Sequence, residues 1–366
     1  MTDKGLTACR GGIEPIDGPH GPLVVAYVRG HAYGHVALDL LMASAYARQQ
    51  GADLCLIHPP EVTAPAVFSV VVEGVTRRTD PASTQAARAW WTQHPMAEQI
   101  ATGYPAPYYR RRLLREPIPA ALTPEAEARA RAHATAVGLD LDAPLVTIQA
   151  RDQHGPPRKI RPHWDSRVRN AQIETYHDAI DVFLGRGYTV VRMGDTSMPP
   201  LSREGVIDLA VLPETGLLQL ACLFRSRCLL CSQSGPGTVG LLTNTPTLMA
   251  NAIDPVGAYP IRADGRLLMK RILDRETGQL IDPLSPRHLS AARNTRQWTY
   301  LDVPSRVLAA AAEDLLEDVA SPVPETPKQS AIRLRTALCG NADRKWGTDQ
   351  GFIGDGRWCR QMFDEW

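Results

Sequence analysis

A stretch of small and hydroxylated residues, Ser232–Thr238, is the part of this chain that is best suited to bind a ligand. It follows the apolar run Cys228–Cys231 and precedes the apolar run Val239–Leu242. This order predicts a strand, a loop and a helix. Such a loop points backbone N–H groups and the positive end of a helix dipole at an anion. We predict a diphosphate-binding loop in which the hydroxyls of Ser234 and Thr238 add contacts. An ordinary strand-to-helix turn is the alternative.

Two arginines, Arg151 and Arg192, follow predicted strands, at the edge where ligands gather in parallel α/β sheets. A guanidinium group can clamp a diphosphate with two parallel hydrogen bonds and offset the charge that builds on a leaving group. We predict this role for either arginine. A salt bridge from Arg151 to Asp152, or from Arg192 to Asp195, is the alternative in each case.

The loop before the first long helix holds the candidates for a general base. His31 and His35 flank Gly34, and Asp39 lies one helical turn after His35. A histidine has a pKa suited to taking a proton from a hydroxyl, and a carboxylate at i+4 could orient it. We predict that His35 is the base and Asp39 its partner, with Asp152 as a weaker candidate. A capping or packing role for His35 is the alternative.

Composition excludes several classes of protein. Of the 366 residues, 40 are Lys or Arg and 39 are Asp or Glu, so the basic excess of a nucleic-acid-binding protein is absent. The seven cysteines are scattered, which suggests a reducing compartment, and we interpret Cys228 and Cys231 as buried strand residues. The chain shows no signal-peptide pattern and no apolar run of membrane-spanning length. We expect a cytoplasmic protein, and contact with a membrane surface stays open.

The first half of the sequence predicts a strand over Pro22–Val28, a helix over Val36–Gln50 and a strand over Ala52–Ile57, which is a βαβ unit. We also expect a strand over Val67–Val72, polar helical structure over 82–115 and a helix that starts at Thr123. The loop in the βαβ unit lacks G-x-G-x-x-G spacing, which argues against a nicotinamide-dependent oxidoreductase.

The second half predicts a strand over Pro144–Gln149, an amphipathic helix over Arg169–Leu184 and three apolar runs between Tyr188 and Ala250. A long loop with polar turns is expected over 251–300, followed by helices over Ser305–Val319 and Ser330–Leu338. This rhythm indicates an α/β fold with two Rossmann-like domains that face a cleft. We divide the chain into an arm (1–20), an N-terminal domain (21–125), a C-terminal domain (126–320) and a tail (321–366) that packs back on the N-terminal domain.

Two sets of residues carry a resemblance to known proteins. The segment Ser234-Gly235-Pro236-Gly237-Thr238, with Pro246 and Thr247-Leu248-Met249 after it, is similar to the donor loop of heptosyltransferase-like enzymes with the GT-B architecture. The Asp and His that usually surround the G-P pair are absent here. A broader set resembles a family of bacterial glycosyltransferases associated with surface-polysaccharide clusters, namely Gly34-His35, Arg151-Asp152, Arg169-Asn170 and Phe352-Ile353-Gly354.

The resemblance implies a glycosyltransferase that moves a sugar from a nucleotide-sugar to a glycan, a lipid-linked acceptor or a small molecule. It implies donor contacts from Arg151, Arg192, Ser232, Ser234, Gly235, Gly237 and Thr238, and acceptor or cleft contacts from His31, Gly34, Arg169 and Asn170. Asn170 could instead cap a helix. No Asp-x-Asp pair ends a strand, so we predict no metal and no cofactor besides the nucleotide-sugar. A nucleotide-sugar epimerase and a non-enzymatic nucleotide- or sugar-binding protein remain alternatives.

Overall fold

The computed structural model describes residues 15–28, 32–59, 61–93, 111–152, 166–255, 257–291, 294–342 and 354–363. The first part of the chain forms β1 (Ile16–Gly18), β2 (Gly21–Tyr27), α2 (Tyr33–Gln50), β3 (Asp53–Ile57), η1 (Pro65–Ser69), β4 (Val70–Val72), α3 (Pro81–Gln93), η2 (Arg111–Leu114), β5 (Ala120–Leu122) and α6 (Pro124–Ala136). Strand β2 precedes α2 in the chain and β3 follows it. The two strands pair in parallel, which confirms the predicted βαβ unit. Gly51 ends α2 with a φ of 60°, a left-handed conformation that glycine adopts without strain.

The rest of the chain builds a larger sheet and its covering helices. Its elements are β6 (Leu145–Gln149), η3 (Ser166–Arg169), η4 (Ile173–Tyr176), α7 (His177–Gly185), β7 (Thr189–Arg192), β8 (Val206–Asp208), η5 (Leu209–Val211), α8 (Gly216–Arg225), β9 (Ser226–Ser232), α9 (Gly235–Leu242), β10 (Thr247–Ala252), β11 (Arg266–Met269), β12 (Arg271–Asp274), α10 (Pro286–Ala291), β13 (Trp298–Leu301), α11 (Ser305–Ala320), α12 (Pro327–Ala342), β14 (Arg357–Trp358) and η7 (Arg360–Phe363).

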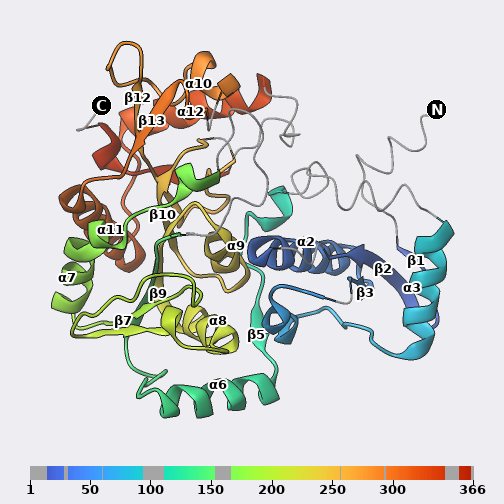
Figure 1. The fold of residues 1–366 in the computed structure, drawn as a ribbon. Coiled ribbons are helices and arrows are strands. Elements are labelled where there is room, and N and C mark those ends of the chain that lie inside the picture. Colours follow the sequence, from blue (N-terminus) through green and yellow to red (C-terminus); the bar gives the residue numbers. More distant parts are fainter. Residues whose placement is uncertain are drawn as a thin grey trace.

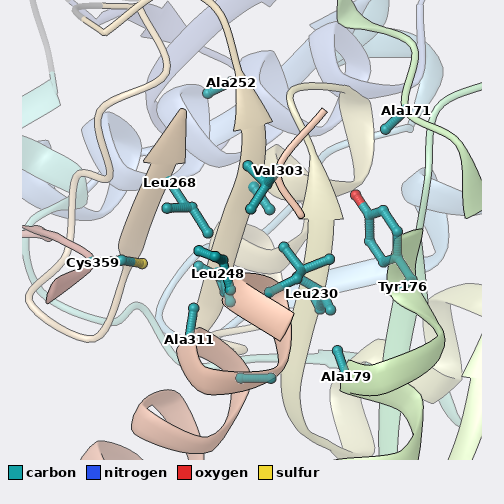
Figure 2. Packing of buried hydrophobic residues seen from close by; sticks show 14 of the residues in the cluster. Ala171, Tyr176, Ala179, Leu230, Leu248, Ala252, Leu268, Val303, Ala311 and Cys359 are labelled. Carbon is teal, nitrogen blue, oxygen red and sulfur yellow. The ribbon is translucent and has the colours of Figure 1, made fainter. Parts of the chain in front are cut away.

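Seven strands of the described residues form a parallel sheet in the order β14-β11-β10-β9-β6-β7-β8 (Figure 1). Parallel strands need helical crossovers, so helices cover both faces. Side chains alternate along β9: Cys228 and Leu230 join the core that includes α7 and α11, whereas Leu229 and Cys231 join the core that includes α8 and α9. Figure 2 shows Leu230 and Leu248 within the first of these cores. This alternation confirms that both cysteines are buried strand residues.

The second core joins the two halves of the chain. It contains Val36 and Leu40 from α2 together with Val239 and Leu242 from α9, all of them buried. Helices α2 and α9 are therefore packed against one another, as Figure 1 shows near the centre of the molecule. This contact places the start of α2 beside the start of α9.

Several elements differ from the sequence-based expectation. The segment 169–184 is not one helix, because 3-10 turns occupy its first half and α7 begins only at His177. The predicted strand over Val67–Val72 is a 3-10 helix followed by the short β4. Much of the segment 251–300 is loop and turn, as predicted, but it also contains β11, β12, α10 and most of β13. These strands are only four residues long each, which is too short to show a clear alternation of apolar and polar residues.

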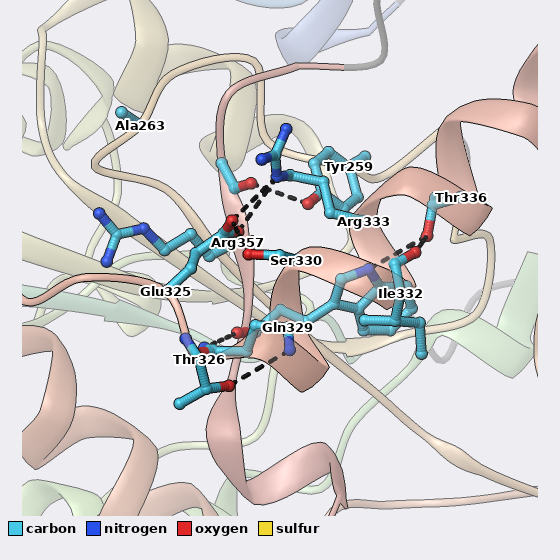
Figure 3. Close-up of polar contacts among 12 residues, drawn as sticks. Tyr259, Ala263, Glu325, Thr326, Gln329, Ser330, Ile332, Arg333, Thr336 and Arg357 are labelled. Atoms are coloured by element: carbon cyan, nitrogen blue, oxygen red, sulfur yellow. Dashed lines mark hydrogen bonds and ion pairs between the residues drawn. The ribbon is translucent and has the colours of Figure 1, made fainter.

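The tail does not simply return to the first half of the chain. Strand β14 pairs with β11 at the edge of the large sheet, and α12 covers it. Gln329 donates to the Trp358 carbonyl at 2.6 Å, and the Trp358 indole N–H donates to Thr336 at 3.1 Å (Figure 3). An ion pair between Arg115 and Asp355 links this tail to the segment before β5. Phe352 and Ile353, which contribute to the resemblance, lie outside the described residues.

Candidate functional site

The candidate site lies where the central strands of the large sheet end. Strands β6 and β9 are neighbours, and Gln149 lies opposite Cys231 in their register. Ser232 ends β9, and α9 begins three residues later at Gly235. The carboxyl edge of a parallel sheet is the usual place for ligands in α/β folds. The predicted loop is thus a strand-to-helix connection at that edge.

A buried polar network fixes the start of this loop. The Ser232 hydroxyl, which is fully buried, accepts from the Arg151 backbone N–H at 2.8 Å and lies 3.4 Å from Gln149 Oε1. The Ser234 hydroxyl donates to Gln149 Oε1 at 2.7 Å and lies 3.1 Å from the Ser232 carbonyl oxygen. Both hydroxyls are therefore engaged inside the protein. The Ser232 hydroxyl is fully buried in this network, whereas Ser234 is partly exposed.

The start of α9 carries no side-chain cap. Ser234 is the N-cap residue, but its side chain makes no capping hydrogen bond and its backbone is extended. The second helical residue is Pro236, which has no N–H, so the backbone donors of this end are those of Gly235 and Gly237. Unsatisfied N–H groups at a helix start attract anions.

The glycines of this site make room for neighbouring elements. A Cβ atom on Gly34 would lie 2.8 Å from Gly235 Cα and 3.4 Å from Thr238 Oγ1, so the first turns of α2 and α9 touch. A Cβ atom on Gly237 would lie 2.7 Å from the Met249 side chain, inside the core. Gly34 and Gly235 allow the two helices to approach, and Gly237 allows α9 to pack on the sheet.

Helix α2 also begins without a cap. Its N-cap is Ala32, which has no polar side chain, and no acidic residue lies in its first turn. The first turn of α9 lacks acidic residues as well. Each helix start carries a partial positive charge of about half an elementary charge. Two uncompensated helix starts in contact form a location that favours a negative group.

Arg151 extends from the end of β6 toward Asn170. Its Nη1 atom donates to Asn170 Oδ1 at 2.5 Å, and the residue is only 6% exposed. The structure thus brings together two of the predicted site residues, and Asn170 caps no helix, because it follows a 3-10 turn. Arg169 lies directly before Asn170, at the end of that turn.

Sequence analysis missed several polar residues at this edge. The Lys270 ammonium, which follows β11, donates to the Asn170 carbonyl at 2.6 Å and forms an ion pair with Asp302 at 2.5 Å. Gln233 Oε1 accepts from the Ile253 N–H at 3.0 Å, which ties the loop to the end of β10. A single polar residue after a short strand forms no recognisable sequence motif. The position of Lys270 at this edge becomes apparent only once β11 is placed in the sheet.

Arg192 corrects a prediction. Its guanidinium is fully buried, and Nη1 donates to Asp208 Oδ2 at 2.8 Å and to the Pro199 carbonyl at 2.7 Å. The partner is therefore Asp208 on the adjacent β8, and not Asp195. A fully buried guanidinium in the core offers no surface to a ligand. Arg192 therefore stabilises the sheet through its contact with Asp208, and we no longer count it among the donor-binding residues.

The candidate bases lie near the contact of the two helix starts. His35 is the third residue of α2 and is partly buried, and Asp39 is buried one turn later. Gly34, which precedes His35 in the chain, contacts the first turn of α9. Asp152 is partly buried after Arg151, on the opposite element. His31 lies outside the described residues.

Burial makes the nearby thiol an unsuitable nucleophile. Desolvation raises the pKa of Cys231 to about 12, and the pKa of Cys228 also to about 12. Both thiols therefore stay protonated at neutral pH, and their alternating orientation in β9 keeps them from forming a pair. This agrees with the sequence-based interpretation of the C-x-x-C spacing.

A pocket of about 560 Å³ lies away from this edge. It is lined by residues that precede β11 or surround β14, including Arg262, Asp264, Glu325, Arg333 and Arg357. Parallel strands begin there, so the pocket lies at the amino end of the sheet. Some of its charges are paired within the wall, namely Arg333 with Glu325 (Figure 3) and Arg115 with Asp355. None of the predicted site residues lines it.

No helix in the described part of the chain is both long and apolar enough to cross a lipid bilayer.

Comparison with solved structures identifies the fold. The chain is similar to the crystal structure of the glycosyl transferase family 9 protein from Veillonella parvula, with a TM-score of 0.51 and 12% identity, over 81% of this chain and 97% of that one. It also matches E. coli ADP-heptose LPS heptosyltransferase II, with a TM-score of 0.46 and 13% identity, over 81% and 100%. No protein-family model and no curated protein matches the sequence. The α/β fold with a large parallel sheet is thus shared with the first of these structures.

Proposed function

We propose that this protein is a glycosyltransferase that binds a nucleotide-sugar at the carboxyl edge of its large sheet. The observation that carries the proposal is the contact between the first turns of α2 and α9, neither of which has a side-chain cap. A diphosphate supplies the negative charge that two such helix starts favour. The fold shared with the Veillonella parvula glycosyl transferase adds support.

Arg151 is the proposed positive group for the leaving nucleoside diphosphate. It projects from the same strand end as Gln149, beside the loop that leads into α9. Asn170 Oδ1 accepts one of its N–H groups and so fixes the orientation of the guanidinium plane. A preorganised cation stabilises charge that develops in the transition state without a reorganisation cost. The proposal requires no metal ion.

His35 is the proposed base, and Asp39 is its proposed partner. His35 belongs to the helix whose first turn contacts α9, so it borders the place where the sugar of the donor would lie. The acceptor, a glycan, a lipid-linked glycan or a small molecule, would approach from the side of α2. Its hydroxyl oxygen would form a bond to the anomeric carbon of the sugar and lose its proton to His35, while the bond from that carbon to the diphosphate breaks and the nucleoside diphosphate leaves.

The decisive experiment measures release of nucleoside diphosphate from each common nucleotide-sugar, without an acceptor, with and without EDTA. We expect release from one donor, insensitive to EDTA. Arg151→Ala should reduce the affinity for that nucleoside diphosphate by about tenfold to a hundredfold, since a hydrogen bond to a charged group is lost. Arg186→Ala is the control, because Arg186 is an exposed arginine at the end of α7 that pairs with Glu313 on α11.

The melting temperature of each variant separates loss of the site from loss of the fold. Failure of every nucleoside diphosphate to bind or to stabilise the folded protein would refute the donor site. Release that disappears in EDTA would refute the metal-independent reaction while leaving the donor site in place.

A further inference from the structure

The side chain of Gln149 determines where the Ser234 hydroxyl points. A serine at an N-cap normally accepts a hydrogen bond from the second or third helical N–H. In α9 the second residue is Pro236, so the only such donor is the N–H of Gly237. The Ser234 hydroxyl instead donates to Gln149 Oε1 at 2.7 Å, with the Ser232 carbonyl oxygen at 3.1 Å as a second acceptor. The cap that the sequence would allow is thus not formed.

Gln149 is held in place by the sheet. It is the last residue of β6, it is 3% exposed, and β9 pairs with it on one side. Ser232 from β9 adds a second hydroxyl near Gln149 Oε1, at 3.4 Å. A side chain fixed in this way draws Ser234 toward the strand and away from the axis of α9.

We propose that Gln149 is a positioning residue that keeps the Gly237 N–H available for the diphosphate of the nucleotide-sugar. The inference rests on the proposed function. Without the Gln149 acceptor, the Ser234 hydroxyl turns to the Gly237 N–H and forms the ordinary cap. The protein's own side chain then competes with the diphosphate for that donor.

The test compares four proteins: wild type, Gln149→Leu, Ser234→Ala and the double variant. Calorimetric titration with ADP, GDP, UDP, CDP and inorganic pyrophosphate gives the affinities. We expect Gln149→Leu to weaken binding by roughly threefold to thirtyfold, the range that corresponds to a gained N-cap interaction. Ser234→Ala has no hydroxyl that could form the cap, so its affinity is the reference for the double variant. The double variant should return to the affinity of Ser234→Ala, because the competing hydroxyl is gone.

Gln219→Leu serves as the matched control. Gln219 is also a buried glutamine, 6% exposed, and it bonds to Gly194 and Thr215 away from the loop. This variant should lower the melting temperature without changing the affinity. Wild-type affinity in Gln149→Leu would overturn the inference. A double variant as weak as Gln149→Leu would overturn it too, because Gln149 would then act through packing alone.

Hydrogen exchange of the Gly237 amide without ligand separates this inference from the proposed function. The amide should exchange more slowly in Gln149→Leu than in wild type, and at the wild-type rate in the double variant. If no diphosphate binds the wild type, the proposed function fails, and the exchange rates still show whether Gln149 prevents the cap. Equal exchange in all four proteins would overturn the role of Gln149.

Discussion

Arg151 and Arg192 show how two arginines in the same sequence context acquire different roles. Both come at the carboxyl end of a strand of the large sheet. Arg151 lies at the end of the central β6, beside the loop before α9, and bonds Asn170. Arg192 lies on β7, next to the edge strand β8, and its side chain is enclosed with Asp208. Position within the sheet, rather than position along a strand, decides which guanidinium can meet a ligand.

Substitution of Arg192 should therefore reduce stability. Arg192→Met leaves the buried Asp208 carboxylate without its cation, which costs about 3–5 kcal/mol of the free energy of unfolding. Combining it with Asp208→Asn should cost less, because no unpaired charge remains. Chemical denaturation measures both. Arg203→Met, which removes a more exposed ion pair with Asp181, should cost below about 1 kcal/mol. A stable Arg192→Met variant that no longer binds nucleoside diphosphate would instead restore the original donor-binding prediction.

At the scale of elements, the contact between α2 and α9 depends on two glycines. A Cβ atom on Gly34 or on Gly235 would approach the backbone of the other helix to 2.8 Å. Backbone cannot move aside as a flexible side chain does. Alanine at either position therefore separates the helix starts and disturbs the core that they share.

We expect Gly34→Ala and Gly235→Ala each to cost about 1–3 kcal/mol of stability and to weaken nucleoside diphosphate binding. Their combination should cost less than the sum, because one displacement relieves both clashes. Gly216→Ala is the control, since Gly216 also begins a helix but has open space around its Cα. Thermal denaturation and calorimetry measure these effects. Additive costs would mean that the two glycines act separately.

Helix α6 provides a pH-dependent test at the same scale. The hydrogen bond from Arg131 holds the pKa of the Asp142 carboxyl below its ordinary value. A carboxyl whose pKa is lower in the folded than in the unfolded state stabilises the folded protein when the pH is above the unfolded-state pKa. This stabilisation is lost as the pH falls through the folded-state pKa. Asp142→Asn should therefore be less stable than wild type at pH 7, with the difference shrinking below about pH 4. Urea denaturation across pH 2–7 measures it, with the exposed Glu204→Gln as control.

For the whole molecule, the tail is part of the fold. Trp358 on β14 is fully buried between β11 and α12, and its ring lies edge-on to Tyr259 with centroids 6.2 Å apart. Strand β14 also covers the edge of β11, which would otherwise expose unpaired backbone groups. The last described residues of the chain thus complete the large sheet.

Trp358→Ala should cost about 3–5 kcal/mol, because it leaves a large cavity and removes the bond to Thr336. Leu338→Ala on the neighbouring α12 is the control, since that side chain is 62% exposed and should change stability by less than about 0.5 kcal/mol. Equilibrium denaturation compares them. A Trp358→Ala variant as stable as wild type would show that the tail does not contribute to the stability of the fold.

Local elements with strong sequence patterns could be predicted without the structure. The βαβ unit, the cap of α6 by Thr123, α11 and the strand–loop–helix around Ser232–Thr238 follow from apolar periodicity and turn residues within about 20 neighbours. The role of Arg192, the place of β11 and β14, and the partners of Ser234 were decided by the tertiary structure alone. Each depends on which strands become neighbours, and strand order is set by contacts between residues far apart in the chain. Gln149 is the clearest case, because an ordinary glutamine gains its importance only when β9 brings Ser232 and Ser234 beside it.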